Sequence, residues 1–121
     1  LPEGYAPAKI WLVMEPAAQD GTSDRLIGLS NLRLELTDYL RQFGGHVGYS
    51  IAPDCWGQGY GTQLLALTLD KARQEGLQRL LITCDQSNLG SARVIEKNGG
   101  ILENMVTEAD GNLLCRYWID L

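Results

Sequence analysis

Glycine occupies every second position in one short stretch of the chain, Trp56-Gly57-Gln58-Gly59-Tyr60-Gly61. Glycine lets the backbone turn its N–H groups inward and lets a ligand approach closely. Residues 46–52, before the stretch, favour a strand, and residues 60–75, after it, have helical periodicity. The N-terminus of a helix carries about half a positive charge. A strand, a glycine loop and a helix in this order therefore favour the binding of a phosphate or pyrophosphate group.

Spacing separates the known kinds of phosphate-binding glycine loop. A dinucleotide loop has the pattern G-x-G-x-x-G, and Thr62 occupies the place of its last glycine. A nucleoside triphosphate loop ends in Gly-Lys followed by Ser or Thr, and the chain lacks that ending. The spacing excludes both kinds, and the remaining alternative to a phosphate site is that the glycines only form a tight turn.

A second motif lies downstream, where Asn88 is followed by Ser91 and then by Glu96-Lys97-Asn98-Gly99. Together with Gly59 and Gly61, this motif resembles the GNAT family of N-acetyltransferases, whose loop reads Gln/Arg-x-x-Gly-x-Gly/Ala. Trp56 replaces the leading Gln or Arg, a variant that is frequent in several branches of that family. The resemblance covers nearly the whole chain. Within the family, the chain looks like a member of a poorly characterised bacterial subgroup. It favours a cofactor loop over a simple turn.

Apolar periodicity and turn residues predict elements in the order β-β-β-α-β-α-β-β. Residues 46–84 form a β-α-β unit with parallel strands, and antiparallel hairpins flank it, so the fold class is α/β with a mixed sheet (α+β). The resemblance implies the GNAT-like acyl-CoA N-acyltransferase fold. The predicted strands are 9–15, 25–36, 46–52, 78–84, 101–107 and 113–120, the helices 60–75 and 88–98, and the turns 16–24, 38–42 and 110–112.

Length, composition and charge narrow the class of protein to which the chain can belong. Its 121 residues, 45% hydrophobic and 21% charged, fit one domain over residues 1–121 that needs neither a disulfide nor a metal to fold. A net charge of −5 disfavours nucleic-acid binding, and the sequence leads us to expect neither a signal peptide nor a membrane-spanning segment. The chain has an odd number of cysteines, Cys55, Cys84 and Cys115, which is typical of reduced thiols in a cytoplasmic protein rather than of a disulfide framework. Cys55 could act as a nucleophile only if the fold brought it close to His46, the only histidine, which lies on a separate segment.

The resemblance implies that acetyl-CoA lies in a V-shaped gap between two parallel strands, here residues 46–52 and 78–84. Backbone groups of the first strand would pair with the pantetheine arm, the loop amides would bind the pyrophosphate, and Asn88 would hydrogen-bond the arm. An amine would then attack the thioester carbonyl directly. The implied cofactor-binding residues are Tyr49, Ser50, Ile51, Trp56, Gly57, Gln58, Gly59, Tyr60, Gly61, Thr62, Asn88 and Ser91.

The general acid departs from the family pattern. Many relatives carry a Tyr one residue before the Glu-Lys pair, and this chain has Ile95 there, which cannot donate a proton. Ser91 and Tyr117 are candidate substitutes. Alternatively, the leaving thiolate takes its proton from water or from the ammonium product.

The general base departs from it as well. The position where relatives often carry Glu falls on Gly45, and the neighbouring His46 would face the other way unless a bulge intervenes. His46 has the pKa range of a base at neutral pH, or it is a hydrogen-bonded structural residue. Glu35 is the other candidate, on a polar strand face with Asn31 and Arg33. That row would alternatively bind the substrate, or Glu35 would be a solvated surface carboxylate.

Family members usually begin with another strand and one or two helices that border the acceptor site. Only Leu1 to Ala8 precede the first predicted strand here, so the domain is expected to be shortened at its N-terminus, and an uncovered strand edge would favour a homodimer. The leading function is an acetyl-CoA-dependent N-acetyltransferase acting on a small-molecule or peptide amine. The alternatives are a non-catalytic acyl-CoA-binding module and a structural domain that does not use the site.

Overall fold

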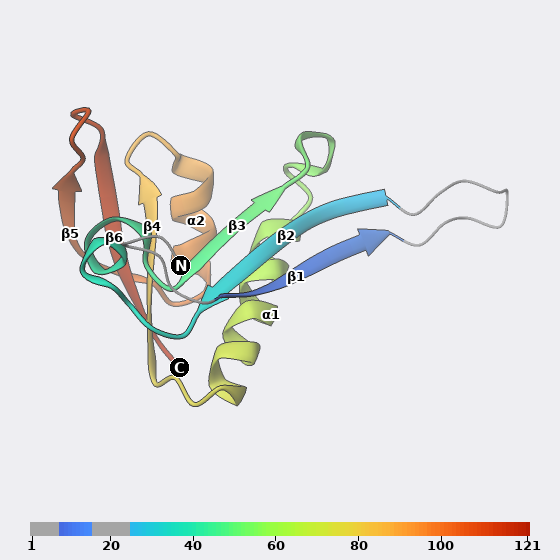
Figure 1. Ribbon diagram of the computed structural model, residues 1–121. Coiled ribbons are helices and arrows are strands. Elements are labelled where there is room, and N and C mark those ends of the chain that lie inside the picture. The colour runs from blue at the N-terminus through green and yellow to red at the C-terminus, as the bar shows by residue number, and fades with distance from the viewer. Residues whose placement is uncertain (1–7, 16–24) are drawn as a thin grey trace, which may run out of the picture.

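Figure 1 shows a computed structural model of the chain, which describes residues 8–15 and 25–121. In this part of the chain, six strands form one sheet in the order β1-β2-β3-β4-β6-β5. The turn predicted at residues 16–24 lies outside the described residues. The strands are β1 (Ala8–Glu15), β2 (Arg25–Arg33), β3 (Val47–Ile51), β4 (Arg79–Asp85), β5 (Ile101–Thr107) and β6 (Leu113–Asp120). The helices are α1 (Tyr60–Gln74) and α2 (Leu89–Lys97), with short helical turns η1 (Leu40–Gly44) and η2 (Pro53–Cys55).

The predicted mixed sheet and the predicted order of its elements are confirmed. Neighbouring strands are antiparallel, except that β3 and β4 are parallel and are joined by the crossover helix α1. The end of β2 was predicted too late, at Leu36. It ends at Arg33, because β3 begins only at Val47, which pairs with Leu32, so later residues of the segment have no partner on β3. The helical turn predicted near residues 38–42 is present and includes η1.

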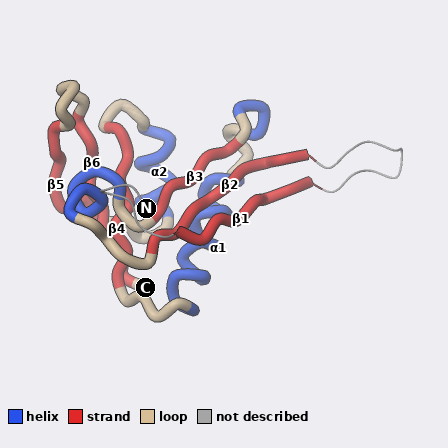
Figure 2. The backbone as a smooth tube through the Cα atoms, viewed as in Figure 1, coloured by secondary structure: helices blue, strands red, loops and turns tan. Residues whose placement is uncertain are grey.

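Both long helices pack against one face of the sheet, and they also contact each other (Figures 1 and 2). Leu65, Leu69 and Ala72 of α1 and Ile95 of α2 are fully or almost fully buried with side chains of β4 and β6. A polar contact also joins α1 to β2, since the buried hydroxyls of Thr68 and Ser30 lie 2.9 Å apart. Apolar burial at helical spacing therefore fixes α1 beneath the strands that it connects.

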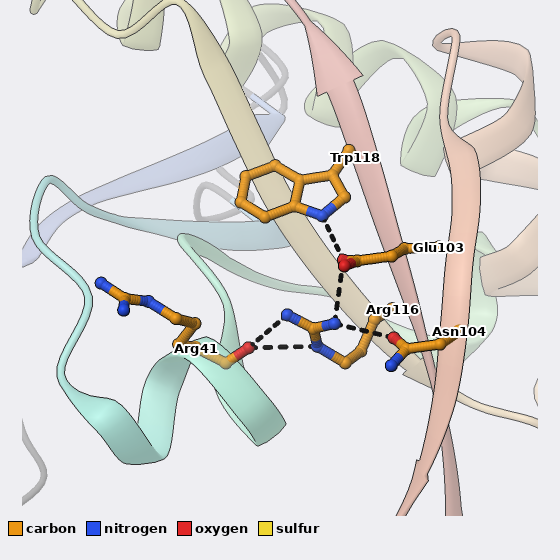
Figure 3. Close-up of polar contacts among 5 residues, drawn as sticks. All are labelled: Arg41, Glu103, Asn104, Arg116 and Trp118. Carbon is orange, nitrogen blue, oxygen red and sulfur yellow. Dashed lines mark hydrogen bonds and ion pairs between the residues drawn. The ribbon is translucent and has the colours of Figure 1, made fainter.

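On the face of the sheet away from the two long helices, the buried Arg116 makes a network of hydrogen bonds (Figure 3). Cys115, Tyr117 and Ile119 of β6 belong to the helix-side core, so the alternation of side chains along a strand directs Arg116 to the other face. Its guanidinium donates two hydrogen bonds to the Arg41 carbonyl oxygen of η1, at 3.1 and 2.8 Å. It also bonds Asn104 Oδ1 at 2.7 Å and Glu103 Oε2 at 2.9 Å on β5. Arg116 thus connects η1, which leads into β3, to the C-terminal hairpin.

No helix in the described part of the chain combines the length and apolar character that a membrane span requires. All three cysteines are buried and form no disulfide among the described residues, and Cys84 and Cys115 lie opposite each other on β4 and β6.

Candidate functional site

The parallel strands β3 and β4 pair at a single position, Val47 with Ile82. Beyond this pair β3 turns away from β4 (Figure 1), while β4 stays paired with β6 from Arg79 to Asp85. The chain thus forms a fork between two parallel strands, with its narrow end at Val47. The V-shaped gap that was expected between residues 46–52 and 78–84 is present in this geometry.

Backbone groups of β3 face into the fork. The Ala52 N–H donates to Ile27 O of β2, and the Gly48 N–H donates to Asn31 Oδ1 of the same strand. Because successive residues of a strand direct their N–H and C=O groups to alternate sides, the backbone groups of Tyr49 and Ile51 point toward β4. Beyond Val47, the described part of β4 offers them no strand partner. An extended ligand in the fork therefore meets a strand edge with hydrogen-bonding capacity.

The glycine loop lies at the wide end of the fork and leads into α1. Gly57 and Gly59 have left-handed backbone conformations, with φ of +76° and +83°, and Gly59 is the N-cap of the helix. A Cβ atom at either position would meet no atom within 4 Å, so conformation rather than space requires glycine there. Gly61 differs, because a Cβ atom there would lie 3.3 Å from Val94 Cγ2 of α2. The loop thus directs the N-terminus of α1, with its partial positive charge, at the space beside α2.

A cavity of about 630 Å³ occupies this space between the loop, β3 and α2. Every residue predicted to bind the cofactor lines it except Gln58, whose amide instead donates to the Asp54 carbonyl oxygen. Trp56 is 67% exposed, and its indole N–H donates to Ile51 O at 2.8 Å. Asn88 caps α2, since its Oδ1 accepts the Ser91 N–H at 3.0 Å, which leaves the amide nitrogen to contact a ligand. The predicted residues are therefore brought together, although their binding role stays a prediction.

Sequence reasoning missed five residues that line the cavity: Cys55, Gly90, Arg93, Val94 and Lys97. The signal was available, because Gly90, Arg93, Val94 and Lys97 follow one another at the spacing of a single helix face. Arg93 and Lys97 are exposed, and no ion pair of either is found among the described residues. Two cations beside a helix N-terminus make this part of an acidic protein favourable for an anion.

His46 lies at the narrow end of the fork and is not among the cavity-lining residues. Its side chain is buried, and Nδ1 accepts a hydrogen bond from the Leu81 N–H at 2.8 Å. Burial lowers the pKa of His46, and the charge of Arg33 lowers it further. Gly45 cannot carry the family's Glu without a backbone shift, because its φ is +67° and a Cβ would lie 2.6 Å from Leu81 O. The regular pairing of β3 with β2 begins after His46, at Val47, and has no register shift from there to Ile51.

Two members of the predicted polar row, Asn31 and Arg33, lie on β2, whereas Glu35 lies beyond its end. Asn31 bonds the Gly48 amide, and Arg33 donates to the carbonyl oxygens of Gly44 and Gly45, so both side chains hold the start of β3. Glu35 is exposed in the bend after β2, because that strand ends at Arg33. None of these residues lines the cavity.

The two candidate acids lie in different surroundings. Ser91 lines the cavity, and its hydroxyl is 2.8 Å from the Tyr49 hydroxyl. Tyr117 is buried away from the cavity and donates to Glu96 Oε1 at 3.3 Å. Burial, together with the charge of Glu96, raises the pKa of Tyr117 to about 12. Ile95, at the position of the family's Tyr, is completely buried in the core.

Comparison with known families identifies the fold. A family model described as "Acetyltransferase (GNAT) domain" matches residues 3–101. No curated protein matches the chain in a search by sequence. Solved structures do match it, including a mutant form of the spermidine N-acetyltransferase SpeG from Vibrio cholerae, with 22% identity and a TM-score of 0.72 over 93% of this chain. The chain spans 65% of that protein's length.

Two further structures are similar. The Salmonella typhimurium protein yncA, described as an acetyltransferase and solved with its cofactor acetyl-CoA, has 21% identity and a TM-score of 0.63 over 80% of this chain. A ribosomal-protein-alanine acetyltransferase from Vibrio fischeri has 20% identity and a TM-score of 0.67 over 79% of this chain. The chain spans 59% and 55% of those two proteins, so it covers less than two thirds of each of these three relatives.

Proposed function

The chain belongs to the GNAT acetyltransferase family, and we propose that it transfers an acetyl group from acetyl-CoA to a primary amine. The observation that carries the proposal is the fork between β3 and β4. It joins a strand edge that has no partner strand beyond Val47 on β4 to a glycine loop and a helix N-terminus within one cavity. This arrangement suits a ligand with an amide-containing arm and a pyrophosphate, which is the chemical composition of coenzyme A.

The residues present fit such a ligand. Amides of Trp56 to Thr62 would bind the pyrophosphate at the start of α1, and Arg93 and Lys97 would supply positive charge from α2. Backbone groups of Tyr49 and Ile51 would pair with the arm, and the amide nitrogen of Asn88 would bond it from the other side. When bound, acetyl-CoA supplies an acetyl group already activated as a thioester.

The chain would contribute positioning and electrostatic stabilisation. A backbone N–H of β3 that faces the fork would stabilise the oxyanion formed when the amine attacks the thioester carbonyl. Ser91 is the predicted acid that lines the cavity, and Tyr117, Glu35 and His46 do not line it. An amine that enters the site already deprotonated would need no protein base, and the fork would then act chiefly by holding both reactants together.

We propose a small amine as the acceptor. A spermidine N-acetyltransferase is among the similar structures, and the net charge of −5 favours the approach of a cation. A ribosomal-protein-alanine acetyltransferase is also similar, so peptides with N-terminal alanine belong in the same test.

A non-catalytic acyl-CoA-binding domain is the second candidate. It is favoured by the complete burial of Ile95 at the position of the family's Tyr. It is also favoured by the engagement of His46 Nδ1 with the Leu81 backbone. Both observations leave the cofactor cavity unaffected, so the two candidates differ in turnover and not in binding.

The deciding experiment measures binding first and turnover second. Acetyl-CoA should raise the melting temperature in a saturable manner, with adenosine as the control ligand. Release of free CoA is then followed with polyamines, simple primary amines and alanine-initiated peptides. Amine-dependent CoA release would support the transferase, whereas binding without release would support the non-catalytic domain. Absence of saturable binding would refute both.

Three broader proposals accompany this function. We propose that residues 1–121 form one domain, since the six described strands share one sheet. A cytoplasmic location is proposed because the three cysteines form no disulfide among the described residues. A homodimer is proposed because β1 is an edge strand on which Ile10 and Leu12 are 66% and 61% exposed. Sedimentation equilibrium would test the dimer, and a monomer at micromolar concentration would refute it.

A further inference from the structure

Two hydroxyl groups meet inside the cavity from different elements. The Tyr49 hydroxyl of β3 lies 2.8 Å from the Ser91 hydroxyl of α2, and both residues line the cavity. The Tyr49 ring is half-buried beside the start of α1, since a Cβ on Gly61 would lie 3.9 Å from Tyr49 Cε2. The ring is therefore held in place, and its hydroxyl is presented at a defined position.

The pair lies toward the narrow end of the fork. Tyr49 is two residues beyond Val47, the residue at which β3 and β4 are still paired. Ser91 is in the first turn of α2, and its hydroxyl also interacts with the Cys84 thiol of β4. The glycine loop lies at the wide end, where β3 has already left β4. A ligand whose phosphates occupy the loop and whose arm follows β3 therefore directs its far end, the sulfur, toward this pair.

We propose that the Tyr49 and Ser91 hydroxyls form a donor chain that stabilises the departing thiolate, with Tyr49 donating to Ser91 and Ser91 donating to the sulfur. This inference rests on the proposed function. In the step concerned, the bond between the carbonyl carbon and the amine nitrogen has formed, and the bond between that carbon and sulfur breaks. The electron pair of the broken bond stays on sulfur as a thiolate. The proton lost from the nitrogen passes to solvent, from which the thiolate is later protonated.

Donation suits this pair better than proton loss. Burial raises the pKa of Tyr49 above its ordinary value near 10, although the hydrogen bond with Ser91 opposes the rise. A phenol with a raised pKa keeps its proton at neutral pH and remains a donor. Two hydroxyls in series also polarise each other, and such a chain stabilises a charged acceptor more than a single hydroxyl does.

The test compares CoA with desulfo-CoA, which lacks only the sulfur. Affinities for both ligands are measured for the wild type, Tyr49→Phe and Ser91→Ala, below and above the usual thiol pKa of about 8.5. Tyr39→Phe is the matched control, because Tyr39 is 57% exposed and contacts the Phe43 ring outside the cavity. Melting curves establish that each variant is folded.

In the wild type and in Tyr39→Phe, the preference for CoA over desulfo-CoA should increase as pH rises through the thiol pKa. Tyr49→Phe should reduce that preference by about three- to tenfold at the higher pH, and Ser91→Ala by at least as much. An unchanged preference in Tyr49→Phe, with CoA still bound, would overturn the inference and leave the proposed function standing. Failure of the wild type to bind either ligand would overturn both.

Discussion

His46 bonds both backbone groups of Leu81. Its N–H donates to Leu81 O at 2.7 Å, and its imidazole Nδ1 accepts the Leu81 N–H at 2.8 Å. The second bond assigns the ring proton to Nε2 and requires a neutral imidazole. These contacts close the narrow end of the fork, immediately before the single pair between β3 and β4.

Protonation of His46 should destabilise the fold. Since burial and Arg33 lower the pKa of His46, the unfolded chain binds a proton at a higher pH than the folded chain does. The stabilising effect is complete above the unfolded pKa of about 6.5 and is lost as pH falls toward the folded pKa. Denaturant unfolding at pH values on both sides of this range measures the loss.

His46→Asn should keep an acceptor for the Leu81 N–H but remove this part of the pH dependence. His46→Ala should cost about 1–3 kcal/mol at neutral pH, because the buried N–H loses its partner. The same pH dependence in wild type and His46→Asn would contradict the assignment. A loss of turnover in His46→Ala with unchanged stability would indicate instead that His46 acts as a base.

Gly59→Asp should reduce CoA affinity by more than tenfold, because it places a carboxylate at the start of α1, where the pyrophosphate would bind. Gly59→Asn is the matched control. Asn has nearly the same shape and, like Asp, tolerates the left-handed backbone that Gly59 adopts. Calorimetric titration of both variants separates charge from backbone strain, and equal affinities would refute a phosphate site at this loop.

Arg93→Gln and Lys97→Gln should each weaken CoA binding by about three- to tenfold at low salt, because each removes a cation from the cavity wall. The difference from wild type should shrink as salt screens these exposed charges. Lys71→Gln is the control, since Lys71 lies in the last turn of α1 and does not line the cavity. An equal effect of all three substitutions would point to net charge alone.

Arg116→Lys should lower the free energy of unfolding by about 1–3 kcal/mol. Lysine keeps the charge but cannot make the forked contacts with the Arg41 carbonyl, Glu103 and Asn104 (Figure 3). Arg79→Lys on β4 should cost less than about 1 kcal/mol, because Arg79 is exposed and only stacks on Trp118 and pairs loosely with Asp120. Urea unfolding compares the two, and equal losses would show that the Arg116 network adds no stability of its own.

Local sequence patterns were sufficient to predict most of the helices and strands. Apolar periodicity placed α1 and α2, and in the structure Asn88 caps α2, because helix contacts lie within one turn of the sequence. The last two strands have the predicted bounds, since a strong turn at residues 110–112 joins them. The end of β2 was misplaced, because alternation continued through Leu36 while its partner β3 begins only opposite Leu32. The end of β2 depends on where its partner β3 begins, and β3 is distant from it in the sequence.

The amino-acid sequence by itself determined the glycine loop, the Asn88 motif and the family, because these depend on residue type and short spacing. Only the tertiary structure decided which side chains share the cavity. In that structure Nδ1 of His46 accepts a hydrogen bond from the Leu81 backbone, and Glu35 lies beyond the end of β2. The tertiary structure also brings Tyr49 to Ser91 across 42 residues. Such contacts depend on where β3 separates from β4, and that point is set by packing against α1, η1 and β6, which no local pattern encodes.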